Sequence, residues 1–259
     1  MAIVNLTPDS FSGDGLAYHA DAAVESGLKA VQAGADVIDL GGESTAYWRE
    51  GYEPVSVEEE LSRVLPAIER LQRLTEAPIS IDTRKPEVAR RALEAGARWL
   101  NDVEGVWDDG TMAALAAEYR AAFVLMHNRR QEGFTDVVGE VRDVLAAAAE
   151  RALAAGLPRE LLVLDPGFGF GKTAENNLEL LRRLSELRQL GFPLLVGTSR
   201  KRFLGHILGT PPEDRLEGTE ASVAIAIAHG ADAVRVHDVE PIVRIVRVSD
   251  AIVRGGDAT

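Results

Sequence analysis

The stretch Ala33-Gly34-Ala35-Asp36 separates a segment with helical periodicity from a short apolar run, and two related stretches repeat this arrangement further along the chain. These are Ala95-Gly96-Ala97-Arg98 and His229-Gly230-Ala231-Asp232. A glycine just past a helix end adopts the left-handed backbone conformation that a Cβ atom would oppose. Each stretch therefore predicts the end of a helix followed by the start of a strand.

Eight short runs rich in Val, Ile and Leu extend this pattern over all 259 residues, and several are apolar at consecutive positions. Strands of parallel sheets have such sequences because both of their faces are covered. Between the runs lie helix-length segments with apolar residues three and four positions apart, such as Leu61, Val64 and Ile68. The runs are 2–5, 37–40, 78–82, 98–102, 122–127, 161–165, 193–197 and 232–237. Eight alternating units predict an α/β fold, a single-domain (βα)8 TIM barrel over residues 1–259, rather than an open doubly wound sheet.

The composition narrows the class of function. Apolar residues make up 46% and charged residues 27% of the chain, which is ordinary for a globular protein. The absence of cysteine excludes disulfides and thiolate metal sites. Without a bilayer-length apolar run or a basic leader, we expect no membrane association and a cytoplasmic location. The net charge of −13 disfavours nucleic acid as a partner, so an anionic small substrate would need a local group of cations.

Polar residues close the predicted strands, where a (βα)8 barrel places its chemistry. They are Asn5, Asp39, Asp82, Asn101, Asp102, His127, Asp165, Arg235 and His237, with Thr198-Ser199-Arg200-Lys201 after the seventh run. Taken alone, Asp82 is compatible with a helix cap, and Asp165 before Pro166 with a turn. The convergence of the whole set on one barrel mouth favours a binding site.

The glycine-rich segment 166–173 superficially resembles a phosphate-binding loop. That motif needs a glycine at position 166, which is Pro166, and the third glycine of a dinucleotide fingerprint would fall on Lys172. Both nucleotide-binding interpretations therefore fail. The segment instead predicts a loop that brings its backbone and Phe170 close to a flat ligand.

Cations cluster after the seventh and eighth runs. Arg200, Lys201 and Arg202 lie where barrels often bind phosphate at a helix start, although a solvated helix start has the same composition. Arg235 and His237 are two positions apart on a strand and so point to the same side. Because burying an unpaired arginine is costly, Arg235 needs an anionic partner or an open barrel mouth.

Seven motifs, taken in order, resemble the dihydropteroate synthase family from residue 5 to residue 238. They are Asn5-Leu6-Thr7-Pro8-Asp9-Ser10-Phe11, Asp39-Leu40-Gly41-Gly42-Glu43-Ser44-Thr45, Ser80-Ile81-Asp82-Thr83, Asn101-Asp102, Asp165-Pro166-Gly167-Phe168-Gly169-Phe170-Gly171-Lys172, Ser199-Arg200-Lys201 and Arg235-Val236-His237-Asp238. The resemblance implies a homodimer that uses Mg2+ and condenses 6-hydroxymethyl-7,8-dihydropterin pyrophosphate with 4-aminobenzoate, giving 7,8-dihydropteroate and pyrophosphate for folate biosynthesis.

The resemblance also implies a role for each matching residue. Asn5 would help to hold Mg2+ on the pyrophosphate. The edges of the pterin would be bound by Asp82, Asn101, Asp165 and Lys201, and the pyrophosphate by Arg235 and His237. The 4-aminobenzoate would be framed by Pro8, Phe11, Thr45, Phe170 and Ser199. Asp39 and Met126 complete the expected substrate-binding set. The expected catalytic set is Asp82, Lys201, Arg235 and His237.

The chain departs from the family pattern in three places. Ala46-Tyr47-Trp48 follows the second motif where the family usually has an arginine and a proline, and the first arginine is Arg49. Met126-His127-Asn128-Arg129-Arg130 adds two cations after the fifth run. The first predicted strand begins at residue 2, whereas the family normally has further residues upstream, which points to a truncated start.

Two other functions fit parts of the sequence. A corrinoid-linked methyltetrahydrofolate methyltransferase shares the barrel and the pterin pocket, but methyl transfer has no pyrophosphate for the cationic motifs to hold. A non-catalytic pterin-binding paralogue is the second alternative, favoured by the altered segment after Thr45, which would position the transition state. Pyrophosphate release from the pterin substrate distinguishes these possibilities.

Overall fold

A ring of parallel strands forms the centre of the computed structural model, which describes residues 1–6, 16–44, 52, 54–129 and 133–255. Six strands pair in sequence order: β1 (Ala2–Asn5), β2 (Ile38–Gly41), β3 (Ile79–Asp82), β4 (Trp99–Asp102), β5 (Ala122–Met126) and β6 (Leu162–Asp165). Strands β7 (Leu195–Val196) and β8 (Ala233–Val234) form a second parallel pair. Single bridges join β6 to the start of β7 at Leu164 and Leu194, and β1 to the end of β8 at Ala2 and Val236. The eight strands therefore close into the predicted barrel.

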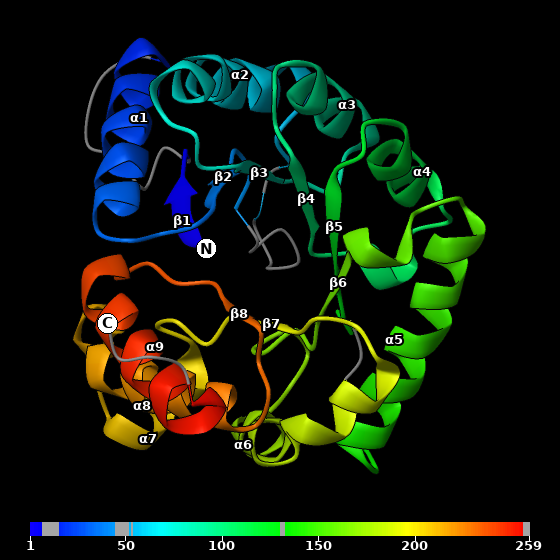
Figure 1. Ribbon diagram of the computed structural model, residues 1–259, viewed down its shortest axis with the longest axis vertical. Helices are drawn as coiled ribbons and strands as arrows, with labels where there is room; N and C mark the ends of the chain where they lie inside the picture. Colours follow the sequence, from blue (N-terminus) through cyan, green and yellow to red (C-terminus); the bar gives the residue numbers. More distant parts are fainter. Residues whose placement is uncertain (7–15, 45–51, 53, 130–132, 256–259) are drawn as a thin grey trace.

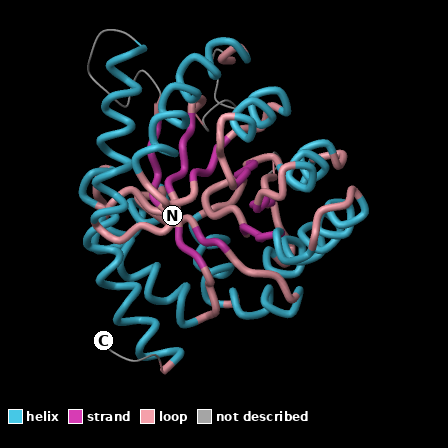
Figure 2. The backbone as a smooth tube through the Cα atoms, turned by 45° about the horizontal axis from the view of Figure 1, so that its top comes forward, coloured by secondary structure: helices cyan, strands magenta, loops and turns pink. Residues whose placement is uncertain are grey.

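Helices surround this ring, as Figures 1 and 2 show. They are α1 (Leu16–Gln32), α2 (Val57–Leu74), α3 (Pro86–Glu94), α4 (Thr111–Glu118), α5 (Val137–Ala154), α6 (Ala174–Arg182), α7 (Arg202–Leu208), α8 (Leu216–Ala228) and α9 (Val239–Arg254). Short 3-10 turns occur at Gly105–Trp107, Arg159–Leu161, Leu184–Leu190 and Pro212–Asp214. The α7 helix is an addition between β7 and α8, and it begins at the predicted cationic helix start. Within the described ranges, no helix combines the length and apolarity needed to cross a membrane.

The last two strands are shorter than the predicted runs 193–197 and 232–237. The Asp232 carboxylate accepts a hydrogen bond from Leu194 N at 3.0 Å, so a side chain contributes to the contact at the start of this pair. Beyond the pair, Arg235 N still donates to Val196 O at 3.0 Å. The backbones therefore remain adjacent as far as the functional end of the barrel, although the regular ladder is only two residues long.

Strand alternation divides the interior into layers. Val124, Val163 and Leu195 are buried together in the lumen, with Trp99 and Ala233 packed against them. Side chains two positions further along a strand point to the same face, one layer nearer the carboxyl ends. The outward-facing strand residues pack instead against the helices in a larger cluster that includes Ile38, Leu40, Ile81, Leu100 and Phe123. The apolar lumen layer thus forms the floor beneath the polar residues that end the strands.

Candidate active site

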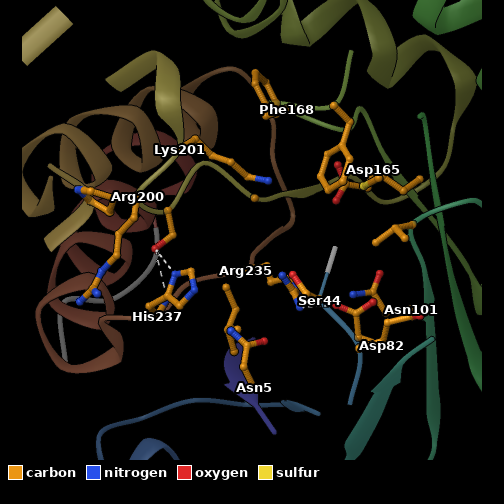
Figure 3. A pocket seen from close by; sticks show the side chains of 18 residues that line it. Asn5, Ser44, Asp82, Asn101, Asp165, Phe168, Arg200, Lys201, Arg235 and His237 are labelled. Atoms are coloured by element: carbon orange, nitrogen blue, oxygen red, sulfur yellow. Dashed lines mark hydrogen bonds and ion pairs between the residues drawn. The ribbon is translucent and has the colours of Figure 1, made fainter. Parts of the chain in front are cut away.

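A cavity of about 430 Å3 opens at the carboxyl ends of the strands. Ten residues expected at the site line it: Asn5, Asp82, Asn101, Met126, Asp165, Phe170, Ser199, Lys201, Arg235 and His237. Figure 3 shows Asp82, Asn101 and Asp165 on one side, Arg200 and His237 on the other, and Lys201 and Arg235 between them. The predicted acids and cations therefore share a single small-molecule cavity.

The strand pleat places most of these side chains. Met126 and Asp165 lie two positions after the lumen residues Val124 and Val163. Arg235 follows Ala233 by the same interval, and His237 continues the series. On each of these strands, the lumen-facing residue in the apolar floor is therefore followed two positions later by a residue that lines the cavity.

Arg235 is the centre of a buried network that joins four strands. Its Nε donates to Asp39 Oδ2 at 2.6 Å and its Nη2 donates to Asp82 Oδ2 at 2.7 Å. Asn101 Nδ2 donates to the same Asp39 oxygen at 3.1 Å. Asp39 is fully buried behind these groups and does not line the cavity. It therefore holds Arg235 and Asn101 in place, whereas Asp82 faces the cavity.

Burial controls the protonation of the carboxylates. It raises the pKa of Asp82 above its usual value, with Arg235 opposing and Asp39 reinforcing the shift. Burial also raises the pKa of Asp165, whose Oδ1 accepts a hydrogen bond from Gly167 N at 2.7 Å. Ionising these buried acids is therefore costly, and a ligand that donates N–H groups would stabilise their charged forms.

The cations respond to the same environment. Burial, followed by the charge of Arg235, lowers the pKa of Lys201 to about 8. Burial also opposes the charge on Arg235, but Asp39 and Asp82 outweigh it and keep the pKa of Arg235 above its ordinary value. Arg235 would thus be charged when an anion enters the cavity, and the anion would stabilise the charged form of Lys201.

His237 and Ser199 form a polar pair at the rim. Ser199 Oγ accepts a hydrogen bond from His237 N at 3.2 Å and lies 3.0 Å from His237 Nδ1. Partial loss of water contact and then the charge of Arg235 lower the pKa of His237 to about 4. In the neutral ring the Ser199 hydroxyl donates to Nδ1, which leaves Nε2–H as a donor for a ligand.

A flat apolar surface adjoins the acids. Phe170 packs with Met126 and Val103, and Lys201 Nζ lies 4.3 Å from the centre of the Phe170 ring. A cation over an aromatic face is attracted to it. Phe170 therefore supports Lys201 and offers the surface that the glycine-rich segment was expected to supply.

The glycines of that segment are required by its path. Gly167, Gly169 and Gly171 all have positive φ. A Cβ atom on Gly167 would lie 1.8 Å from His127 O, and one on Gly171 would lie 2.0 Å from Arg129 O. The segment thus packs directly on the backbone that follows β5, which brings Phe170 into the cavity.

Further cavity-lining residues were not among the expected site residues. They are Ile3, Glu43, Ser44, Val103, Phe168, Gly197, Arg200 and Pro212. Strand alternation could have identified Ile3 and Val103, which lie two positions from Asn5 and Asn101. Arg200 was named in the cationic cluster and in the Ser199-Arg200-Lys201 motif, but without a role of its own. It has a φ of 56° and pairs with Asp238.

Several expected features lie outside the described residues or away from the cavity. Pro8, Phe11, Thr45 and Arg49 belong to the first group. Arg129, one of the two additional cations, pairs with Glu140 at 2.6 Å and lies over the Phe134 ring. Arg130 is also outside the described residues.

The described ranges contain no group of three His, Cys, Asp or Glu residues suited to hold a metal ion. Asn5 nevertheless places a neutral amide at the cavity wall. Mg2+ commonly uses one or two protein oxygens together with substrate phosphates, so this donor set fits a metal that enters with a phosphate ligand.

Comparison with known proteins gives a consistent result. The family model described as pterin binding enzyme matches residues 1–237. The dihydropteroate synthase of Synechocystis sp. is 47% identical over 262 residues, covering 98% of this chain and 90% of the relative. A crystal structure of the Clostridium difficile dihydropteroate synthase in the presence of pteroic acid has a TM-score of 0.92 at 45% identity, covering 98% of this chain and 95% of that one. The Xanthomonas albilineans enzyme with 4-aminobenzoic acid has a TM-score of 0.91 at 45% identity, covering 97% and 91%.

Proposed function

This chain belongs to the pterin-binding enzyme family, and we propose which residues of its cavity bind each substrate in the dihydropteroate synthase reaction. This transferase reaction of folate biosynthesis condenses 6-hydroxymethyl-7,8-dihydropterin pyrophosphate with 4-aminobenzoate. The assignment of roles rests on the arrangement of the cavity. The acids Asp82 and Asp165 lie on one side of Lys201 and Arg235, and His237 lies on the other side.

The acids bind the pterin ring. A pterin carries several N–H donors along one edge, and Asp82, Asp165 and the Asn101 amide oxygen can accept them. Lys201 donates to the ring carbonyl from the neighbouring side. Met126 and Phe170 cover the ring system, since they form the apolar part of the same wall.

The pyrophosphate lies on the other side, toward Arg235 and His237. The guanidinium group and the Nε2–H of the neutral imidazole both donate to phosphate oxygens. Asn5 would supply an amide oxygen to Mg2+, and the bound metal ion would neutralise charge on the pyrophosphate. The protein thus stabilises the negative charge that grows on the leaving group.

Bond breaking requires no covalent intermediate with the protein. The C–O bond between the pterin methylene and the pyrophosphate breaks, and its electron pair leaves with the pyrophosphate. The ionised Asp82 carboxylate stabilises the positive charge that develops on the methylene. The amine of 4-aminobenzoate then forms the C–N bond and loses a proton, with Phe170 and Ser199 helping to position the ring.

The proposal extends to a homodimer formed through the C-terminal helices. Large apolar side chains are exposed on α8 and α9, including Ile225 at 43%, Val248 at 60% and Ile252 at 77%. These helices pack side by side, so they present a shared face that a second copy could cover (Figure 1). An Ile252→Asp substitution should shift the protein from dimer to monomer in light scattering. A wild-type monomer at micromolar concentration would refute the dimer.

The assigned activity is tested by pyrophosphate release from the pterin substrate with and without 4-aminobenzoate. Release accompanied by dihydropteroate formation supports the synthase. Pterin binding without release identifies a binding paralogue, and methyl transfer from methyltetrahydrofolate identifies a methyltransferase. Repeating the assay with a chelator tests Mg2+, since affinity for the pterin pyrophosphate should fall. The cytoplasmic location remains a prediction from sequence.

A further inference from the structure

Lys172 is a charged residue beside the cavity that has no role in the proposed mechanism. Lys172 does not line the cavity, yet its ammonium group makes three contacts beside it. Nζ donates to Gly167 O at 2.9 Å and to Phe170 O at 3.2 Å, and it lies 2.9 Å from His127 Nδ1. An ammonium group has three donors, and these acceptors use all of them.

The three acceptors belong to two different segments. Gly167 and Phe170 are in the turn after β6, whereas His127 follows β5. His127 is buried, and burial followed by the charge of Lys172 lowers its pKa to about 3. The neutral ring therefore accepts at Nδ1 and carries its proton on Nε2. Lys172 thus connects the ends of adjacent strands at the level of the cavity.

The backbone groups that accept hydrogen bonds from Lys172 belong to residues that contact side chains of the cavity wall. Gly167 N donates to Asp165 Oδ1 at 2.7 Å, so fixing Gly167 fixes the orientation of that carboxylate. Phe170 lies beneath Lys201 Nζ. Gly169, between them, packs against the Lys201 stem, since a Cβ atom there would lie 3.0 Å from Lys201 Cδ. One side chain therefore supports three groups of the cavity wall.

We propose that Lys172 is a positioning residue for pterin binding, which fixes the turn after β6 so that Asp165, Phe170 and Lys201 face the ring together. The proposal rests on the proposed function of the cavity. Asn177 supports the turn from the other side, because its Oδ1 accepts a hydrogen bond from Gly169 N at 2.7 Å and its Nδ2 donates to Thr173 O at 2.6 Å. Burial lowers the pKa of Lys172 to about 7, and the charge of Asp165 opposes this shift.

The test compares Lys172→Met and Lys172→Arg with the wild-type protein. Methionine keeps much of the stem but has no donor, and the planar guanidinium of arginine keeps the charge but cannot direct N–H groups at the same three acceptors. Calorimetry with 6-hydroxymethyl-7,8-dihydropterin pyrophosphate and Mg2+ should show Kd raised at least ~10-fold by the methionine variant, since small misplacements of binding groups carry costs of this size. The KM for the pterin should rise more than kcat falls.

Arg159→Met serves as the matched control. Arg159 also donates to two backbone carbonyls, those of Leu190 and Gly191, but at the opposite end of the barrel. It should lower the melting temperature without changing Kd or KM, which separates positioning from general stability. If Lys172→Met does not fold, Lys172→Arg decides the question by the same Kd measurement.

The outcomes separate the two proposals. Wild-type affinity in a folded Lys172 variant would overturn the positioning role while leaving the synthase assignment intact. A wild-type protein that binds the pterin but releases no pyrophosphate would refute the assigned activity, and a raised Kd in the Lys172 variants would still support the positioning role.

Discussion

Replacing Asp82 by asparagine removes one negative charge from the cavity wall and little else. The amide is the same shape, and its oxygen can still accept the hydrogen bond that Arg235 Nη2 now gives to Asp82 Oδ2 at 2.7 Å. Arg235 also retains Asp39, whose carboxylate accepts from Nε at 2.6 Å. The guanidinium is therefore not left as an unpaired buried charge, and the loss of folding free energy should stay below the ~3–5 kcal/mol of a broken buried pair.

The effect on turnover should be larger than the effect on folding. If the Asp82 carboxylate stabilises the positive charge on the pterin methylene, its loss should lower kcat by about 100-fold, or about 2.7 kcal/mol, the effect of losing one charge-stabilising group. Pyrophosphate release at saturating concentrations of both substrates measures this directly. Asp21→Asn, which neutralises an exposed carboxylate on α1 that pairs with Arg70, is the matched control.

The pH profile adds a second signature. Burial raises the pKa of Asp82, so the ionised form appears at higher pH than for a free carboxylate. The value of kcat/KM for the wild-type protein should therefore rise with pH through this raised pKa of the free protein, and Asp82→Asn should lack that limb. Turnover within threefold of the wild type, with the same pH profile, would refute the electrostatic role.

Three further predictions concern the loop, the metal and folding. Gly167→Ala should lower the unfolding free energy by more than ~2 kcal/mol and abolish pterin binding, because its Cβ would lie 1.8 Å from His127 O at a positive φ; unchanged melting and binding would contradict this close approach. Asn5→Ala should reduce the dependence of pterin pyrophosphate affinity on Mg2+, and an unaltered titration would exclude Asn5 as a ligand. Burial raises the pKa of Asp102 to about 8, so its contribution to stability is present below its unfolded pKa near 4 and is lost as pH rises toward 8. Asp102→Asn should therefore gain stability relative to the wild type between pH 4 and pH 8 in denaturant unfolding, and parallel curves would show that Asp102 carries no such cost.

The barrel could be predicted from sequence because its signals are local. Apolar runs, helical periodicity and glycines such as Gly34 each depend on a few neighbouring residues, and their eightfold repetition left few other folds. The strand-ending residues Asp82, Asp165 and Arg235 could be placed at one mouth for the same reason. The short ladder of β7 and β8 could not, because it involves a contact between Asp232 and Leu194 across 38 residues.

The internal roles within the site also escaped prediction. Asp39 was expected among the substrate-binding residues, but the structure places it behind Arg235, a distinction that depends on how deep in the lumen its position on β2 lies. Lys172 was considered as a mismatch in a nucleotide-binding motif and as the last residue of a motif of the resemblance, without a role of its own. Its acceptor His127 becomes a neighbour of Gly167 and Phe170 only when β5 and β6 pair, so no pattern within 166–173 could identify the complete set.

The bond between Arg235 and Asp39 spans 196 positions of the chain. After Asp39 has been synthesised, the ribosome must therefore add another 196 residues before Arg235 can join the centre of the cavity, and until then the Asp39 carboxylate lacks its arginine counterion. Contacts of such high sequence separation slow folding, since the entropy of closing the ring is lost before the pair can form. The nascent chain should accordingly acquire the capacity to bind substrate only after β8 and Arg235 have been synthesised.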